Sequence, residues 1–216
     1  MKFVCFLSFL CCAVLFNSCS TDSSEEQSSG EAGDFPSGAV DLGLPSGIKW
    51  ASCNVGATKP EEYGGYYAWG EIVEKDDYDS DSYLYYKENE GWIFIGDNIG
   101  RTEYDVARTL WGGSWRMPTM EEMQELIDNC VWTWTLYNGI KGQKVTGPNG
   151  NCIFLPAVGY RLSANHYGLG GGGDYWTSTL IESYDSDAYH LYFDSNGAIK
   201  SQDYRFRGQA VRPVTD

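Results

Sequence analysis

One stretch of the chain carries apolar residues at the spacing of a helix. The positions i, i+3, i+4 and i+7 are occupied by Met123, Leu126, Ile127 and Cys130. Thr119 and Glu122 precede this apolar face at the spacing of a capping box, in which each side chain bonds the backbone amide of the other. The pattern therefore predicts a helix that begins just after Thr119 and buries one side. A shorter helix is expected from Thr102, which can cap the following amides, to the residue before Gly112-Gly113.

Elsewhere, alternating apolar and polar residues between turn signals predict short strands. We expect a hairpin over 38–55 and strands at 66–69, 131–136, 141–146, 152–155, 175–179, 188–193, 198–200 and 209–214. Asn138-Gly139 is typical of a tight hairpin turn between two of these strands. In 188–193, the period of two assigns Leu191 and Phe193 to the core and exposes His190 and Tyr192. Two helices followed by a series of short antiparallel strands indicate an α+β fold.

The first 18 residues have the pattern of a secretory signal. Lys2 is followed by an apolar stretch, residues 3–16, which is too short to span a bilayer comfortably. Ser18-Cys19 resembles the lipobox of bacterial lipoproteins, in which the cysteine becomes the lipidated first residue. Residues 19–37 are polar and acidic and are expected to form a disordered tether before a domain at 38–214. The resemblance implies a lipid anchor at Cys19 in the outer membrane. The alternative is an ordinary signal peptide that is cut nearby.

The charge of the chain limits its partners. Its 15 basic and 30 acidic residues give a net charge of −15, which excludes nucleic acid as a partner held by phosphate contacts. The imbalance is uneven, since residues 20–100 hold 17 acids and 4 bases whereas residues 101–216 hold 13 and 10. The second half therefore offers a nearly balanced surface. The acidic residues soon after Cys19 also resemble a surface-export signal of some Gram-negative bacteria.

The chain offers little catalytic or metal-binding chemistry. Once residues 1–18 are removed and Cys19 is lipidated, the remaining cysteines are Cys53, Cys130 and Cys152, which allow at most one disulfide. Asp77, Asp79, Asp81 and Glu88 have the spacing of a calcium loop, but Ser82 occupies the position that needs glycine. No GxSxG nucleophile motif occurs. We expect no metal and no cofactor, and we do not expect an enzyme.

Several separate motifs resemble the Fibrobacter succinogenes major paralogous domain family. They are Asp41–Gly47, Lys49–Ala51, Asn54–Ala57, Trp115–Thr119 with Glu122 and Leu126, Trp176–Thr179, and Val211–Val214. Together they span most of residues 38–214. The resemblance implies a C-type-lectin-like fold, in which two helices support a sheet and later loops form a variable face. It also implies secreted or cell-surface bacterial proteins. Enzymes that generate formylglycine share a lectin-like fold, but they need a reactive cysteine pair, and Cys130 and Cys152 lack matching contexts.

The C-terminal segment has the composition of a binding surface. Residues 174–209 contain 17 Tyr, Asn, Asp, Ser or His residues among 36, which resembles the segments that diversity-generating retroelements vary on a constant lectin-fold scaffold. Tyrosine gives contact area at low entropic cost, and small polar residues give adaptable hydrogen bonds. The predicted ligand-binding residues are Tyr184, Asp185, Asp187, His190, Tyr192, Asp194, Asp203 and Tyr204. The alternative is a set of ordinary polar loops.

These patterns lead to one functional hypothesis and two rivals. The hypothesis is a surface lipoprotein that recognises a protein or a glycan through its C-terminal face. The first rival is a structural envelope lipoprotein whose loops only cover the core. The second is a catalyst of the formylglycine-generating type.

Overall fold

The computed structural model describes residues 38–216. The predicted signal peptide at 1–18, the tether at 19–37 and the lipidation site at Cys19 lie outside the described residues. In the described part of the chain, no helix combines the length and apolar character needed to cross a membrane.

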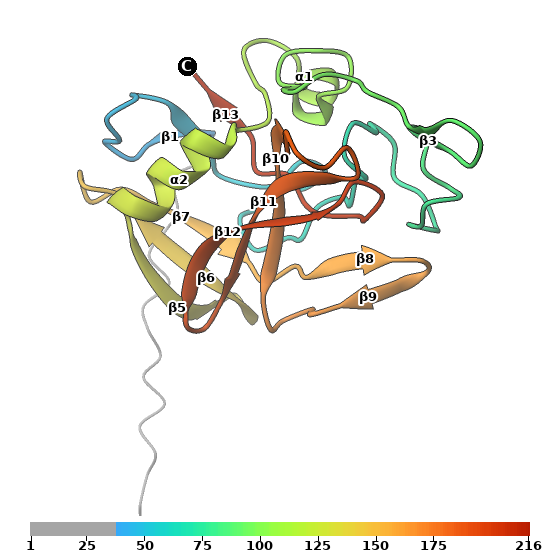
Figure 1. The fold of residues 1–216 in the computed structure, drawn as a ribbon. Coiled ribbons are helices and arrows are strands. Elements are labelled where there is room, and N and C mark those ends of the chain that lie inside the picture. The colour runs from blue at the N-terminus through green and yellow to red at the C-terminus, as the bar shows by residue number, and fades with distance from the viewer. Residues whose placement is uncertain (1–37) are drawn as a thin grey trace, which may run out of the picture. The chain divides into compact units, whose positions relative to one another are not determined.

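Short antiparallel strands and two short helices make up the fold, which confirms the α+β prediction (Figure 1). The helices are α1 (Val106–Trp111) and α2 (Met120–Asn129). The strands of the first half are β1 (Ala39–Asp41), β2 (Lys49–Ala51), β3 (Tyr86–Lys87) and β4 (Gly91–Trp92). Those of the second half are β5 (Val131–Tyr137), β6 (Ile140–Thr146), β7 (Cys152–Pro156), β8 (Tyr160–Leu162), β9 (Asn165–Tyr167), β10 (Gly173–Leu180), β11 (Asp187–Asp194), β12 (Gly197–Tyr204) and β13 (Val214–Thr215).

The strands form small sheets rather than one large sheet. Three three-stranded sheets have the orders β1-β2-β13, β5-β6-β7 and β10-β11-β12, and β3-β4 and β8-β9 are separate hairpins. Val214 pairs with Trp50, so the last strand closes against the first hairpin. Helix α2 lies across the β10-β11-β12 sheet, whereas the β8-β9 hairpin extends to one side (Figure 1).

The predicted helix after Thr119 is confirmed together with its cap. The Thr119 hydroxyl accepts a hydrogen bond from the Glu122 amide at 3.3 Å, and the Glu122 carboxylate accepts one from the Thr119 amide at 2.8 Å. Met123 and Leu126 are fully buried beneath the helix. Arg116 adds a two-pronged contact to the same carboxylate, at 2.6 and 2.7 Å.

Replacing Thr119 with Ala is expected to lower the free energy of unfolding by about 1 kcal/mol, because the Glu122 amide loses its acceptor at the helix start. Chemical denaturation of the purified chain measures this change. Thr119→Ser keeps the hydroxyl and is the matched control, with an expected loss of less than about 0.5 kcal/mol. Equal losses for the two variants would show that the hydroxyl bond does not stabilise the fold.

Several predicted boundaries are wrong. Helix α1 begins after Asp105 rather than Thr102, because the buried Asp105 carboxylate accepts hydrogen bonds from the amides of Arg108 and Met117. Residues 66–69 form a single bridge from Tyr67 to Gln209 instead of a strand. Residues 209–214 likewise contribute only isolated bridges before β13. The β8-β9 and β3-β4 hairpins were not predicted.

Apolar side chains cover both faces of the β10-β11-β12 sheet. Tyr175, Leu191 and Phe193 belong to a large core cluster that includes Met123 and Leu126 of α2. Trp176, Leu180 and Ala188 belong to a second cluster with Val106 and Ala107 of α1. This second cluster covers the face of β11 that carries His190, one of the predicted binding residues.

Candidate ligand-binding surface

Four predicted binding residues gather where β11 begins and β12 ends. Asp187 pairs with Tyr204 across the two strands, and Tyr184 and Asp185 lie in the loop that enters β11. Tyr184 is 59% exposed and Tyr204 is 47% exposed. This end of the hairpin therefore presents two tyrosine rings and two carboxylates to solvent.

Two other predicted residues, Tyr192 and Asp194, lie towards the opposite end of β11. At ~3.3 Å per residue, the Cα atoms of Asp187 and Asp194 are about 23 Å apart. Tyr192 and Asp194 border a separate cavity of about 290 Å³ with Asn196 and Ile199. The structure thus divides the predicted face between two ends of the sheet.

The prediction that His190 is exposed is wrong. Its side chain lies on the face opposite Leu191, as the alternation requires, but it is only 4% exposed because the second apolar cluster covers that face. Its Nδ1 lies 2.9 Å from Oε1 of Gln209, and its ring lies against Trp176. Alternation separates two faces of a strand but does not show that both are covered. His190 therefore does not present its ring to a surface ligand.

Asp203 is half-buried within the same polar network as His190. Its carboxylate accepts hydrogen bonds at 3.0 Å from Gln209 Nε2 and from Arg207. Asp174 lies on this face as well, 6% exposed and 3.6 Å from His190 Nδ1. Sequence reasoning missed Asp174, although the period of two places it on the same face of β10 as Trp176.

Burial sets the ionisation of this network. Desolvation, followed by the nearby Asp203 carboxylate, raises the pKa of Asp174 to about 7. Desolvation lowers the pKa of His190 to about 4, against a smaller opposing effect of its Gln209 contact. Between these values both groups are neutral, and outside them only one is charged. The two shifts therefore disfavour an ion pair between Asp174 and His190, despite their separation of 3.6 Å.

The two shifts have opposite effects on stability. In the folded chain Asp174 keeps its proton up to about pH 7, whereas the unfolded chain releases it above the ordinary pKa of 3.8. Because of this difference, the free energy of unfolding falls as the pH rises towards 7. His190 becomes protonated below pH 6.5 in the unfolded chain but stays neutral in the folded chain. The free energy of unfolding therefore also falls as the pH drops towards 4.

Replacing Asp174 with Asn is expected to raise the free energy of unfolding most at high pH, because the variant has no buried carboxylate to ionise. The stability of the variant relative to the native chain should rise by about 2 kcal/mol between pH 5 and pH 8. Urea denaturation at the two pH values measures the difference. Asp128→Asn, at an exposed position of α2, is the control and should change by less than about 0.5 kcal/mol. A pH-independent difference for Asp174→Asn would contradict the raised pKa.

Aromatic rings extend the exposed group at Tyr204 in two directions. Tyr204 lies parallel to Phe206 at a centroid distance of 5.2 Å, and Phe206 lies nearly parallel to Trp92 at 6.3 Å. On the other side, Arg207 lies 5.9 Å from the Tyr204 ring and 4.9 Å from Tyr160. Tyr160 in turn is parallel to Tyr167 at 5.4 Å. Sequence reasoning missed these flanking rings, whose only signal was the high tyrosine content of the surrounding loops.

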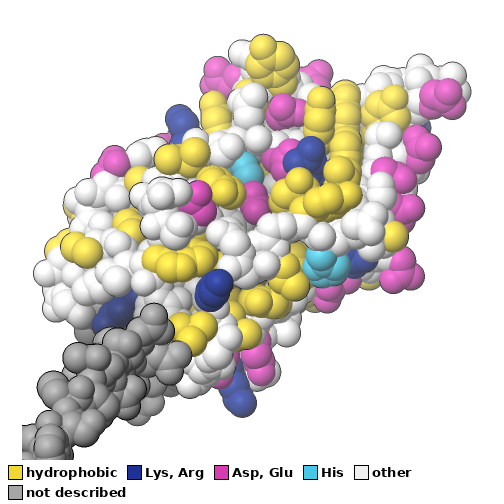
Figure 2. Space-filling model, turned by 90° about the horizontal axis from the view of Figure 1, so that it is seen from below, with side chains coloured by type: hydrophobic (Ala, Val, Ile, Leu, Met, Phe, Trp, Pro, Cys, Tyr) yellow, Lys and Arg dark blue, Asp and Glu magenta, His cyan; other side chains and the backbone are white. Residues whose placement is uncertain are grey.

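We call this group the Tyr204 surface. It comprises Tyr160, Tyr167, Trp92, Phe206, Tyr204, Tyr184, Asp185 and Asp187. Because Trp92, Phe206 and Tyr204 are stacked in series, and Tyr160 is stacked on Tyr167, these rings offer edges and hydroxyl groups to a ligand more than free faces. Figure 2 shows hydrophobic side chains in rows beside single basic side chains on the face seen from below, with acidic side chains along one edge.

A buried arginine holds the backbone beneath this surface. Arg205 is fully buried and donates hydrogen bonds to Asp185 O at 2.9 Å, Ile93 O at 3.1 Å and the Tyr83 hydroxyl at 3.0 Å. Its guanidinium also lies 5.0 Å from the Trp69 ring. One side chain therefore joins the loop that carries Tyr184 to the segment that carries Trp92.

The motifs noted in the sequence lie in the scaffold rather than at this surface. Arg212 is fully buried and donates to Asn54 Oδ1, Ala51 O and Phe154 O at 2.8–3.0 Å. Arg116 bonds the helix-capping Glu122, and Trp176 donates to Tyr67 O at 2.9 Å. These residues stabilise the fold.

Neither metal nor cysteine chemistry is assembled in the described residues. From residue 38 to 216, no group of three or more His, Cys, Asp or Glu side chains is placed to hold a metal ion. Cys53, Cys130 and Cys152 are free thiols, and burial raises the pKa of Cys130 to about 11. At neutral pH this thiol is protonated and weakly nucleophilic. Compared with known proteins, the chain matches no family model, no curated protein and no solved structure.

Proposed function

We propose that the chain is an outer-membrane lipoprotein, anchored through Cys19 and exposed at the cell surface, whose C-type-lectin-like domain binds a protein or glycan through the Tyr204 surface. The fold prediction is supported by the α+β arrangement, with two short helices and small antiparallel sheets. The cell-surface location rests on the sequence of residues 1–37.

One observation carries the binding proposal. Exposed tyrosines and carboxylates from separate segments converge at Tyr204. Stacking on Phe206 holds the Tyr204 ring, stacking on Tyr160 holds Tyr167, and the buried Arg205 holds the backbone of the loop that carries Tyr184. Rings held in this way lose little conformational entropy when a ligand binds. A structural envelope protein needs no such convergence, and this favours the binding function over that rival.

The Tyr204 surface favours some ligands over others. Its edge-on rings and carboxylates suit hydrogen bonds from a glycan or a polar protein epitope. They suit a broad apolar helix less well, because Asp185 and Asp187 would be desolvated without partners. Cell-surface display would bring the domain within reach of either class of ligand.

The test is a binding screen with a variant that removes exposed rings without touching the core. The full-length chain is applied to a glycan array and to a displayed library of folded domains. Tyr167→Ala/Tyr184→Ala/Tyr204→Ala should lose captured ligands by at least 100-fold in affinity, by the usual size of aromatic hot spots.

The matched control is Val131→Ala/Leu136→Ala, which removes exposed apolar side chains from β5, 66% and 63% exposed. This control should bind as the native chain does. If the triple variant folds and binds with unchanged affinity, the Tyr204 surface is not the recognition site.

A further inference from the structure

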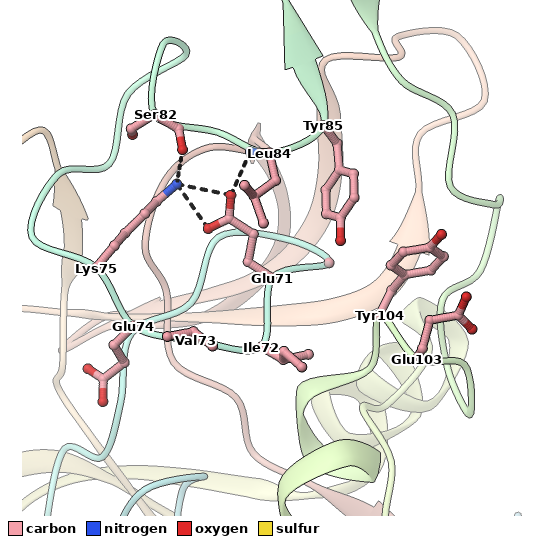
Figure 3. Close-up of a pocket in the computed structure, with 11 residues that line it drawn as sticks. Glu71, Ile72, Val73, Glu74, Lys75, Ser82, Leu84, Tyr85, Glu103 and Tyr104 are labelled. Carbon is pink, nitrogen blue, oxygen red and sulfur yellow. Dashed lines mark hydrogen bonds and ion pairs between the residues drawn. The ribbon is translucent and has the colours of Figure 1, made fainter.

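A separate cavity of about 450 Å³ opens between the loop 70–75, the segment 82–85 and the start of the α1 region. Figure 3 shows Leu84 beside the Tyr85 ring, Tyr104 next to Tyr85, and Ile72 and Val73 beyond Glu71. Val73 and Leu84 are 69% and 68% exposed, so an apolar group entering the cavity would cover side chains that now contact water.

Hydrogen bonds and an ion pair fix the loop 70–75 and the segment 82–85, which line this cavity. Glu71 is 4% exposed, and its carboxylate accepts a hydrogen bond from the Leu84 amide at 2.8 Å and pairs with Lys75 at 2.9 Å. Lys75 Nζ also donates to Ser82 O at 3.0 Å, and Figure 3 marks these bonds. The Glu71–Lys75 pair lies within the loop 70–75, and the hydrogen bonds of its two members to the Leu84 amide and Ser82 O link that loop to the segment 82–85.

The opposite wall and the base of the cavity are fixed as well. Tyr85 and Tyr104 meet edge to face at 5.4 Å. Gly70 has a positive φ of 86°, a backbone conformation that favours glycine. The cavity is consequently preformed, as small-molecule sites usually are.

The charges that line the cavity determine what it can accept. Glu71, Glu74 and Glu103 oppose the single lysine, Lys75, which leaves 3 − 1 = 2 negative charges in excess among the lining residues. Lys75 is already paired with Glu71, and the exposed Glu74 carboxylate accepts a hydrogen bond from the Tyr66 amide at 3.2 Å. Glu103 is exposed at the rim. The excess negative charge disfavours an anion, and a cation would gain from the exposed Glu103 carboxylate and from the tyrosine rings.

We propose that this cavity binds a small organic cation, namely an ammonium group attached to an apolar or aromatic body. The body lies against Val73, Leu84 and the Tyr85 ring, and the ammonium lies towards Glu103 and Tyr104. The site is distinct from the Tyr204 surface and does not depend on the function proposed for it.

The test compares three ligands that share an indole ring and differ in charge: tryptamine, the neutral alcohol tryptophol and the anion indole-3-acetate. Calorimetric titration of the full-length chain should give tightest binding for tryptamine. Tryptophol should bind about tenfold more weakly, and indole-3-acetate should bind more weakly still. Equal affinities, a preference for the anion, or no tryptamine binding at millimolar concentration would overturn the proposal.

Two variants separate the charge from the apolar contact. Glu103→Gln should weaken tryptamine binding by roughly threefold to tenfold and leave tryptophol unchanged, whereas Leu84→Ala should weaken both. Glu88→Gln removes an exposed carboxylate between β3 and β4, outside the cavity, and is the matched control. If Glu88→Gln lowers the affinity for tryptamine as much as Glu103→Gln does, the effect comes from the overall charge of the protein, and the proposed site is wrong. Tyr204→Ala should not change tryptamine binding, which separates this outcome from that of the proposed function.

Discussion

Replacing Arg205 with Met should lower the free energy of unfolding by about 3–5 kcal/mol, the largest loss of stability expected for a single side chain near the binding surface. Methionine fills much of the volume but donates no hydrogen bond. Asp185 O, Ile93 O and the Tyr83 hydroxyl would each lose a donor, in a buried setting at Tyr83 and in a partly buried one at the two carbonyls. Each buried polar group left without a partner costs about 1–3 kcal/mol, and the ring contact with Trp69 would be lost as well.

Urea denaturation of the full-length chain measures this loss. Lys141→Met, which removes an exposed cation from β6, is the control and should change stability by less than about 0.5 kcal/mol. Arg205→Lys keeps the charge, but its single ammonium cannot reach the three acceptors in the geometry of a guanidinium, so it should not restore stability. A small loss for Arg205→Met, similar to that of the control, would show that Arg205 does not hold these loops together.

Tyr204→Ala should weaken ligand binding by about 30-fold, the second large effect, and change stability by less than about 1 kcal/mol. Tyr204 lies at the centre of its surface, with Phe206 on one side and Arg207 on the other. Central aromatic residues carry the largest share of binding energy in most interfaces. Its side chain is 47% exposed, so the folded core does not depend on it.

Titration of the ligand identified by the screen measures the loss. Tyr204→Phe keeps the stacked ring and removes only the hydroxyl group, so it should retain most of the affinity if ring contacts dominate. It should lose about tenfold if the ligand bonds the hydroxyl. Leu136→Ala on β5 is the matched control. If Tyr204→Ala binds the ligand with the affinity of the native chain, Tyr204 does not belong to the binding site.

Local chemistry made part of the fold predictable from the sequence. The capping box of Thr119 and Glu122 and the Asn138-Gly139 turn depend on neighbouring residues only, and both occur as predicted. The burial of Leu191 and Phe193 also followed from alternation. Such features need no knowledge of distant contacts, so a single sequence is enough to reveal them.

Contacts between distant segments made the rest unpredictable. His190 is buried because a second apolar cluster, with residues from α1, covers its side of the sheet. Trp92 and Tyr160 lie far from Tyr204 in the sequence, and only the folded chain brings them beside it. The composition of 174–209 indicated a binding segment, but the structure divides its residues between two ends of β11 and a buried centre.

The most direct test of the binding surface is hydroxyl-radical footprinting of the full-length chain with and without its ligand, because it reports the exposure of individual side chains. We predict that Tyr167, Tyr184, Tyr204 and Phe206 become protected when the ligand binds, while Leu136 and Val131 of β5 do not. Protection of the β5 side chains with unchanged oxidation at Tyr184 and Tyr204 would contradict the account and place recognition on another face.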